Sequence, residues 1–408
     1  MDAAQDSAPK CPFHQGSGKR PETGPDDRKS ARLAAERFST EPGARVTGSF
    51  AFSREVLRSA TMRQAGAGAE KLKMDDPSQL PVFYLDGEPH RRKRAAIARF
   101  FTPKAITTRY REVMERTTDM LLSSLRTSGS AQLDRISFQL AVAVAADIVG
   151  LTESRQAGMA ARISATLSSS FSRRRGRVGQ LFGSMARAWH GFSFFVRDVR
   201  PAIAARRKQR GDDVISHLLD EGYSDQAILI ECMTYAAAGM VTTREFIVMA
   251  AWHLFEREAL RERFLTGGEA DQFAILEEIL RLEPVAAVLH RRAAEPAESA
   301  VAGSVPTGTV IAIDIRAANS DESVTGPCPH QLDPDRAKRM KALGSYMSFG
   351  DGNHRCPGAQ VALHETRVFL DRLLRVPGIR LERVPELRWC DELGSYELRH
   401  ARVACDKG

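Results

Sequence analysis

The sequence predicts a mainly α-helical protein with a small β region, folded as one domain over residues 26–408. Apolar residues at spacings of three and four recur along most of the 408-residue chain, in stretches rich in Ala and Arg. Strand-like segments are few and short, and they cover residues 44–52, 301–315 and 387–403. Two of these three follow the long helical stretches, which favours a helical body with a small sheet region.

The first 25 residues are polar and rich in Gly, Pro and Asp, and we expect this segment to be disordered. It lacks the apolar core of a signal peptide. No run of about 18 apolar residues occurs, so the sequence predicts no membrane span. The six cysteines show no CxxC spacing, which is typical of reduced thiols in a cytoplasmic protein; they are Cys11, Cys232, Cys328, Cys356, Cys390 and Cys405.

The chain is basic, with a formal net charge of +8 and a pI of about 9.3. Of its 59 basic residues, 11 are Lys and 48 are Arg. Such a balance favours an acidic partner. Because no aromatic residues interleave with the basic ones as in a stacking platform for bases, we expect no nucleic-acid binding.

The clearest helix is predicted over residues 224–257. Ser224 is a suitable N-cap, and Asp225 lies in the first turn, where a negative charge is favourable. No proline interrupts the segment, so the helix can run unbroken for roughly 50 Å. Its middle contains three Ala residues and Gly239, which costs about 1 kcal/mol relative to Ala. Small residues at the centre of a buried helix indicate space for a ligand.

A second feature is the segment Phe349-Gly350-Asp351-Gly352-Asn353-His354-Arg355-Cys356-Pro357-Gly358. The glycines allow a tight turn and a close approach of the backbone to a flat ligand. A helix is predicted to begin near Ala359, and amides at its start would point at the sulfur of Cys356 and stabilise a thiolate. A lone cysteine is more often only a small buried apolar residue.

This segment resembles the haem-binding signature of the cytochrome P450 family, Phe-x-x-Gly-x-x-x-Cys-x-Gly, usually with His or Arg two residues before the Cys. The resemblance covers roughly residue 45 to the C-terminus. It implies the cytochrome P450 fold, a triangular prism-like helical body with haem b between the long central helix and the cysteine loop. It also implies that Cys356 binds the iron and that Phe349, Gly350, His354 and Gly358 belong to the cofactor site.

Further family motifs follow in order. Glu278 and Arg281 match the family's Glu-x-x-Arg helix motif, and Arg336 lies where the third member of its buried structural triad belongs. His90 and Arg94 match a His-x-x-x-Arg segment whose two residues share a helix face and contact the haem propionates. Arg292 matches another propionate contact, and His354 a fourth. Each Arg, taken alone, could equally be a solvated surface charge.

The family pattern for the oxygen site is small residue, Gly, any residue, acid, Thr, and it falls in the long helix. This chain reads Ala238-Gly239-Met240-Val241-Thr242-Thr243, so the resemblance implies Thr242, with Thr243 beside it, as catalytic residues. A threonine within a helix otherwise serves packing or bonds back to the preceding turn. Val241 replaces the acid, and proton delivery by waters, by the substrate or by Glu245 remains open.

The predicted substrate pocket is apolar and lined by side chains of modest size; these residues are Ala237, Ala238, Val241, Val285, Val288 and Leu289. Residues 171–210 correspond to the family's mobile lid and are rich in Arg and aromatic side chains, among them Arg173, Arg174, Arg175, Arg177, Phe182, Trp189 and Phe192. This composition indicates either a solvated basic helix face or recognition of an acidic, peptide or carrier-bound substrate.

The resemblance implies a monomeric haem-thiolate monooxygenase that uses O2 and two electrons to oxidise a small organic molecule or peptide in bacterial secondary metabolism. The electrons would come from NAD(P)H through a separate reductase and ferredoxin, because 408 residues leave no space for a fused reductase. Arg91, Arg92, Lys93 and Arg355 are expected on the Cys side of the haem, where they would attract an acidic ferredoxin.

Two alternatives remain. The missing acid at Val241 favours oxidative coupling or ring closure, such as aryl or peptide cross-linking, without oxygen insertion. A non-catalytic haem protein that senses or stores a ligand is the other.

Overall fold

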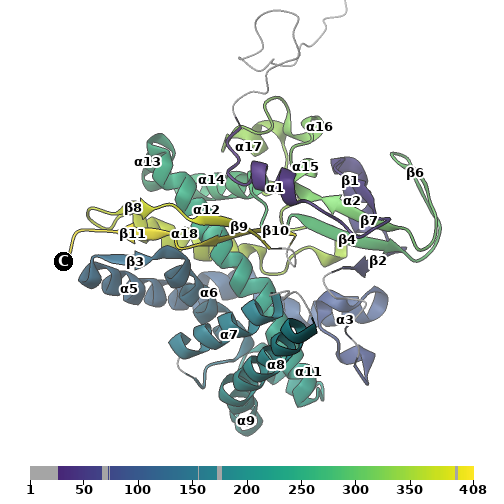
Figure 1. Cartoon of the computed structure of the whole chain (residues 1–408), viewed down its shortest axis with the longest axis horizontal. Coiled ribbons are helices and arrows are strands. Elements are labelled where there is room, and N and C mark those ends of the chain that lie inside the picture. The colour runs from purple at the N-terminus through teal and green to yellow at the C-terminus, as the bar shows by residue number, and fades with distance from the viewer. Residues whose placement is uncertain (1–25, 67–71, 73, 155, 172–176, 391–393) are drawn as a thin grey trace, which may run out of the picture.

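The computed structural model describes residues 26–66, 72, 74–154, 156–171, 177–390 and 394–408. Segment 1–25 and Arg173, Arg174 and Arg175, on which two of the predictions fall, lie outside these residues. The described chain is mainly helical with small sheets, as predicted (Figure 1). None of the described helices is long and apolar enough to cross a bilayer.

The helical part is built from long helices around one core and short helices at its edge. The largest hydrophobic cluster includes residues from Ile97 to Cys405, so distant parts of the chain share it. The α-helices are α1 (Ala31–Arg37), α2 (Phe50–Arg58), α3 (Gly87–Ala98), α4 (Pro103–Ala105), α5 (Arg111–Ser128), α6 (Leu133–Val149), α7 (Gln156–Phe171), α8 (Arg177–Phe194), α9 (Arg200–Lys208), α10 (Val214–Asp220), α11 (Asp225–Tyr235), α12 (Thr242–Glu256), α13 (Glu258–Thr266), α14 (Glu269–Leu282), α15 (Ile315–Ala318), α16 (Glu322–Thr325), α17 (Arg336–Met340) and α18 (Ala359–Leu374).

Short 3-10 and π segments connect or interrupt these helices. The 3-10 segments are η1 (Pro77–Gln79), η2 (Val82–Tyr84), η3 (Arg99–Phe101) and η7 (Gly352–His354). The π segments are η4 (Ile106–Tyr110), η5 (Phe195–Val199) and η6 (Ala236–Val241).

The strands form small sheets, with β3, β8 and β11 on the left of the view in Figure 1, β9 and β10 near its centre, and β1, β2, β4 and β7 on its right. One sheet has the order β1-β7-β4-β2, in which β1 and β7 are parallel and the other pairs antiparallel. Another has the order β3-β11-β8, and β9–β10 and β5–β6 form two antiparallel pairs. The strands are β1 (Arg45–Thr47), β2 (Met62–Ala65), β3 (Ser130–Gln132), β4 (Val288–Ala293), β5 (Ala297–Ser299), β6 (Gly303–Val305), β7 (Val310–Asp314), β8 (Arg380–Arg383), β9 (Glu386–Cys390), β10 (Ser395–Arg399) and β11 (Arg402–Ala404).

The predicted long helix over 224–257 is present as α11, η6 and α12. The side chain of Ser224 caps it by accepting a hydrogen bond from the amide of Ala227. Its middle is a π turn, which inserts one extra residue into the helix and widens it locally. The π turn coincides with the small residues at 236–239, where the sequence indicated space for a ligand.

Two predictions about the chain need correction. The segment 44–52 is a strand only at Arg45–Thr47, because Ser49 caps a helix that begins at Phe50 and buries Phe52. Cys328 is disulfide-bonded, not a reduced thiol. The lack of CxxC spacing gave no sign of this, because the fold can bring together cysteines that are far apart in sequence.

The structure brings Glu278, Arg281 and Arg336 together as a buried triad. The carboxylate of Glu278 accepts hydrogen bonds from Nε of Arg281 at 2.8 Å and from Nε of Arg336 at 3.2 Å. The remaining nitrogens of Arg336 donate to backbone carbonyls of the segment 325–331. The buried charges are therefore paired, and they hold this loop against α14.

From the triad, the network continues toward the cysteine loop through Asn319. Arg281 donates to the carbonyl of Asn319 at 2.8 Å. The side chain of Asn319 accepts from the amide of Met347 at 2.9 Å and donates to Ser348 Oγ at 2.8 Å. Ser348 immediately precedes Phe349, so the triad fixes the backbone at the point where the loop begins.

Replacement of Arg336 by Ala should lower the free energy of unfolding by about 3–5 kcal/mol, because Glu278 and several carbonyls would remain buried without this partner. Urea unfolding would measure the loss. The matched control is Arg339→Ala, which removes an exposed arginine paired with Asp333 and should cost less than about 1 kcal/mol. Equal losses in the two variants would contradict a special role of the triad.

Candidate active site

The cysteine loop is a compact turn held against α2. Gly350 and Gly352 have φ of +70° and +64°, a region that favours glycine. A Cβ at Gly352 would lie 2.2 Å from the carbonyl oxygen of Leu57, so no side chain fits there. Asp351 accepts two hydrogen bonds from the guanidinium of Arg58 at 3.0 and 3.1 Å. The loop is thus joined to α2 by backbone packing and by a two-pronged ion pair.

The sulfur of Cys356 lies in a cradle of hydrogen-bond donors. The amide of Cys356 donates to the carbonyl of Phe349 at 2.9 Å, which closes the turn. Burial raises the pKa of the Cys356 thiol, whereas the amide of Gly358, the charges of Arg94 and Arg355 and the amide of Ala359 lower it. α18 begins at Ala359, so the positive end of its dipole also faces the sulfur. This donor set suits a thiolate bound to a metal cation.

α3 brings His90 and Arg94 to the same loop. The guanidinium of Arg94 donates to the carbonyl of Arg355 at 2.6 Å. The rings of His90 and His354 are in contact, with centroids 4.0 Å apart and an interplanar angle of 31°, and Nε2 of His354 lies 3.3 Å from Oδ1 of Asp86. Burial, with the nearby charges of His354 and Arg94, lowers the pKa of His90 to about 4, so His90 is neutral at pH 7. Three of the four predicted propionate contacts therefore form one cluster.

The fourth predicted contact, Arg292, does not belong to this cluster. Side chains alternate along β4, so Arg291 and Arg292 point to opposite sides. Arg291 is only 3% exposed and its charge acts on both His90 and Asp86. Arg292 bonds instead to the carbonyl of Gly308 at 3.3 Å on an exposed side. Sequence reasoning missed Arg291, because the choice between adjacent arginines depends on the strand register.

η6 presents a small, open surface in the middle of the central helix. Ala238 is exposed and a Cβ at Gly239 would meet nothing within 4 Å, although Ala236 and Met240 are buried. Thr242 Oγ1 donates to the carbonyl of Ala238 at 2.6 Å. Its lone pairs can therefore accept a hydrogen bond from a group beside the helix. Ala237 is half-buried, and Thr243 is buried.

Aromatic contacts connect the open surface of the central helix to the cysteine loop. The rings of Tyr235, one turn before Ala238, and Phe101 stack with centroids 6.4 Å apart and an interplanar angle of 1°. Phe101 in turn lies beside Gly358, 4.0 Å from where its Cβ would be. η6 and Cys356 therefore belong to one site.

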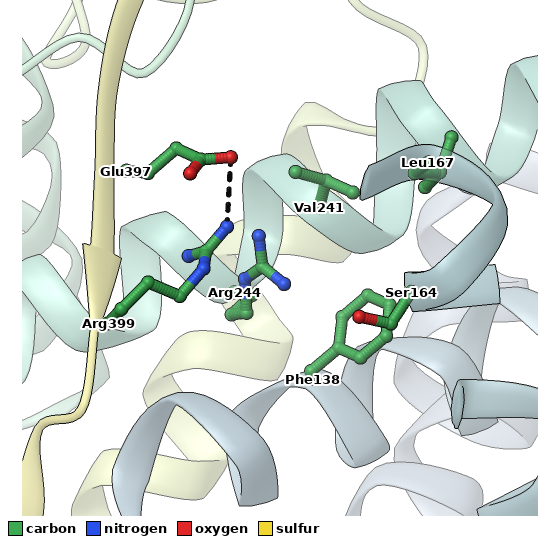
Figure 2. A pocket seen from close by; sticks show the side chains of 7 residues that line it. All are labelled: Phe138, Ser164, Leu167, Val241, Arg244, Glu397 and Arg399. Atoms are coloured by element: carbon green, nitrogen blue, oxygen red, sulfur yellow. Dashed lines mark ion pairs between the residues drawn. The ribbon is translucent and has the colours of Figure 1, made fainter. Parts of the chain in front are cut away.

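Val241, which replaces the family's acid, faces a small polar cavity (Figure 2). The cavity is lined by side chains from α6, α7, the central helix and β10, namely Phe138, Ser164, Leu167, Val241, Arg244, Glu397 and Arg399. Glu397 and Arg399, both on β10, form an ion pair of 3.0 Å at one side of it. Val241 carries no charge, but the charged groups of Glu397 and Arg399 on β10 lie next to this part of the helix.

Glu245 is one of the residues considered for proton delivery. It is fully buried, and its carboxylate accepts hydrogen bonds from both α12 and β10. It accepts from Arg244, from Nη1 of Arg399 at 2.7 Å and from the amide of Leu398 at 2.7 Å. This carboxylate joins α12 to β10. Because its carboxylate oxygens are already engaged by these donors, Glu245 is poorly placed to deliver protons.

The predicted pocket residues on and before β4 lie in different surroundings. Leu289 approaches the cysteine loop, 3.7 Å from where a Cβ of Gly350 would be. Val288 lies beside Gly394, at the end of the β9–β10 pair, and Val285 is buried in the core. These three residues therefore have different neighbours, and their place in one substrate pocket with Ala238 stays a prediction.

The residues present fit a flat, anionic metal porphyrin. Cys356 would hold its iron through the sulfur, which the amides of Gly358 and Ala359 and the charges of Arg94 and Arg355 stabilise as a thiolate. His354, Arg94 and Arg291 would offer donors to its carboxylates, and the small side chains of η6 would leave room for it.

Comparison with known proteins agrees with this site. The family model described as Cytochrome P450 matches residues 273–376. The steroid C26-monooxygenase of Mycolicibacterium smegmatis is 26% identical over 357 residues, which cover 83% of each chain. The mycinamicin IV hydroxylase/epoxidase of Micromonospora griseorubida is 32% identical over 200 residues, which cover 46% of this chain and 48% of that protein.

A solved structure has the same fold. It is P450BioI in complex with a hexadec-9Z-enoic acid ligated acyl carrier protein, and it superposes with a TM-score of 0.73 at 21% identity, covering 93% of this chain and 99% of that one. The matched segment contains Glu278, Arg281, Arg336 and Cys356, the residues that build the triad and the thiolate cradle. The chain belongs to the cytochrome P450 family and is a monooxygenase of that family.

Proposed function

We propose that this monooxygenase inserts one oxygen atom of O2 into a small organic molecule or peptide of bacterial secondary metabolism. The observation that carries the proposal is the thiolate cradle at Cys356, with the open π turn and Thr242 in the same site. The relatives' names support this class of chemistry, since one is a steroid monooxygenase and another a mycinamicin hydroxylase/epoxidase.

The cofactor in this proposal is haem b. When bound through a thiolate, it supplies the activation of O2 and the cleavage of the O–O bond. Cys356 would hold the iron, and Phe349, Gly350 and Gly358 would shape the backbone around it. Arg94, His354 and Arg291 would bind the carboxylates, and neutral His90 would donate a hydrogen bond from its ring.

Thr242 orients the oxygen side of the site in this proposal. Its hydroxyl donates to the carbonyl of Ala238, so the same oxygen can accept a hydrogen bond and hold a proton beside the helix. Because Val241 carries no acid and Glu245 is bound on both sides, protons would reach Thr242 through ordered water or through the substrate.

The substrate would lie against Ala237 and Ala238, with α7 and α8 above it. Trp189 and Phe192 of α8 are 67% and 61% exposed, so they offer apolar surface to a large substrate or to a partner that carries one. The acyl carrier protein bound to P450BioI is a precedent in this fold for a carrier-bound substrate. A cytoplasmic, monomeric enzyme is part of the proposal.

An acidic ferredoxin, reduced by an NAD(P)H-dependent reductase, would supply the electrons. Arg91 and Arg92 are exposed on α3, on the cysteine side, and provide a positive surface for it. Lys93, which we expected on the same surface, is buried and does not contribute.

Oxidative coupling or ring closure without oxygen insertion is the second candidate. It is favoured by Val241, because these reactions depend differently on the delivery of protons. The resulting products differ in mass from those of oxygen insertion.

Exchange of Arg291 for Gln should weaken haem binding by about 10- to 100-fold, because a charge-assisted contact to a carboxylate would be lost. The matched control is Arg292→Gln, which should stay within about twofold, because this side chain points to the exposed side. Haem transfer from each variant to excess apomyoglobin measures the difference. If Arg292→Gln loses haem faster than Arg291→Gln, the assignment of Arg291 is wrong.

Product mass tests the proposed reaction. The enzyme, reduced by ferredoxin and its reductase, would be incubated with a steroid, a macrolide and a carrier-bound fatty acid under isotopically labelled O2. Oxygen insertion predicts a gain of one labelled oxygen atom, and coupling predicts a loss of two hydrogens. Unlabelled oxygen in the product would contradict the proposal.

Thr242→Ala should lower the product formed per NAD(P)H by up to about tenfold, whereas Thr243→Ala should not.

A further inference from the structure

Lys93 and Glu231 form a buried ion pair between α3 and the central helix. Nζ of Lys93 lies 2.9 Å from Oε2 of Glu231, and the two side chains are 6% and 2% exposed. The ammonium also donates to the carbonyl of Leu80 at 2.8 Å and lies 4.7 Å from the ring centre of Tyr223. One cation thus connects α3, α11, the segment before α3 and the turn before α11.

Burying such an ion pair costs hydration free energy, so the pair adds little to the stability of the folded protein. The attraction between two charges in the interior barely repays their loss of hydration, and apolar residues of similar size are often as stable. Burial raises the pKa of Glu231, and the charge of Lys93 opposes this rise. Buried pairs do, however, fix the register of one element against another, because they tolerate only one geometry.

The two elements that the pair joins are the two walls of the cofactor site. On one side, α3 is joined to the cysteine loop by the hydrogen bond of Arg94 and by the contact between the rings of His90 and His354. On the other side, Glu231 lies one helical turn before Tyr235, after which η6 begins. Among the described residues, Lys93–Glu231 is the ion pair that connects α3 directly to α11.

We propose that Lys93 and Glu231 are positioning residues that set the spacing between the cysteine loop and η6, and thereby the fit of the haem. The proposal rests on the assignment of the haem to this site. Neither residue touches the cofactor in this account. They act through α3, which carries Arg94 and His90, and through α11, which leads into the π turn.

The first experiment compares Lys93→Met, Glu231→Leu and the double variant. Each single variant leaves one buried charge unpaired and should lower the thermal midpoint by roughly 3–6 °C. The double variant should regain most of this loss, because Met and Leu can pack together. Yet its rate of haem transfer to apomyoglobin should remain about tenfold above that of the wild type. Haem transfer at the wild-type rate from the stable double variant would overturn the proposal.

A second variant keeps the test decisive if the double variant does not fold. Glu231→Asp retains the charge on an arm that is shorter by one methylene, so it should keep the thermal midpoint within about 2 °C but speed haem transfer several-fold. Unchanged haem transfer in this variant would also overturn the proposal.

The matched control is the exposed ion pair of Glu88 and Arg91 on the same helix. Exchange of each residue for Gln should change neither the thermal midpoint nor the rate of haem transfer. Because the readout is haem transfer and not product, a wrong choice of substrate or reaction would leave this result unaffected. Loss of haem from the control variant at the same raised rate would show that any change in α3 has this effect, and would contradict a special role of the buried pair.

Discussion

The proposed haem site depends on holding the sulfur of Cys356 as a thiolate inside the protein once a metal cation binds it, although burial alone raises the pKa of this thiol. A thiolate in the interior is unfavourable unless donors and positive charge surround it. The amides of Gly358 and Ala359, the start of α18 and the charges of Arg94 and Arg355 meet this need at Cys356. The tight glycine turn precedes these groups in the chain, and the packing of Gly352 on α2 leaves no space there for a larger residue.

Buried charge networks then determine where that sulfur lies. The triad around Glu278 reaches the loop through Asn319 and Ser348 from one side. The ion pair of Lys93 and Glu231 reaches it through α3 from the other. Glu245 joins the central helix to β10 in the same manner. Such networks add little net stability, but each permits only one geometry, and a site that must grip a rigid planar cofactor needs a fixed geometry.

Sequence reasoning succeeded where local pattern determines the outcome. The central helix, the cysteine loop and the helix after it follow from capping, spacing and glycine placement, and the order of motifs placed the triad. It failed where the answer depends on tertiary context. Arg291 and Arg292 are adjacent and differ in the face of the strand on which they lie. Lys93 and Arg92 likewise lie on different sides of α3. In segment 44–52, the N-cap Ser49 ends the strand and begins a helix. Side-chain direction and register are set by neighbours distant in sequence.

The absorption spectrum of the reduced, CO-bound protein tests the central claim most directly. Wild type and Cys232→Ala, which removes another buried cysteine, should both show the band of a thiolate-ligated haem, because the cradle at Cys356 is intact in each. Cys356→Ala should lack that band while remaining folded. A thiolate band that persists in Cys356→Ala, or a wild-type protein that takes up no haem, would contradict the account.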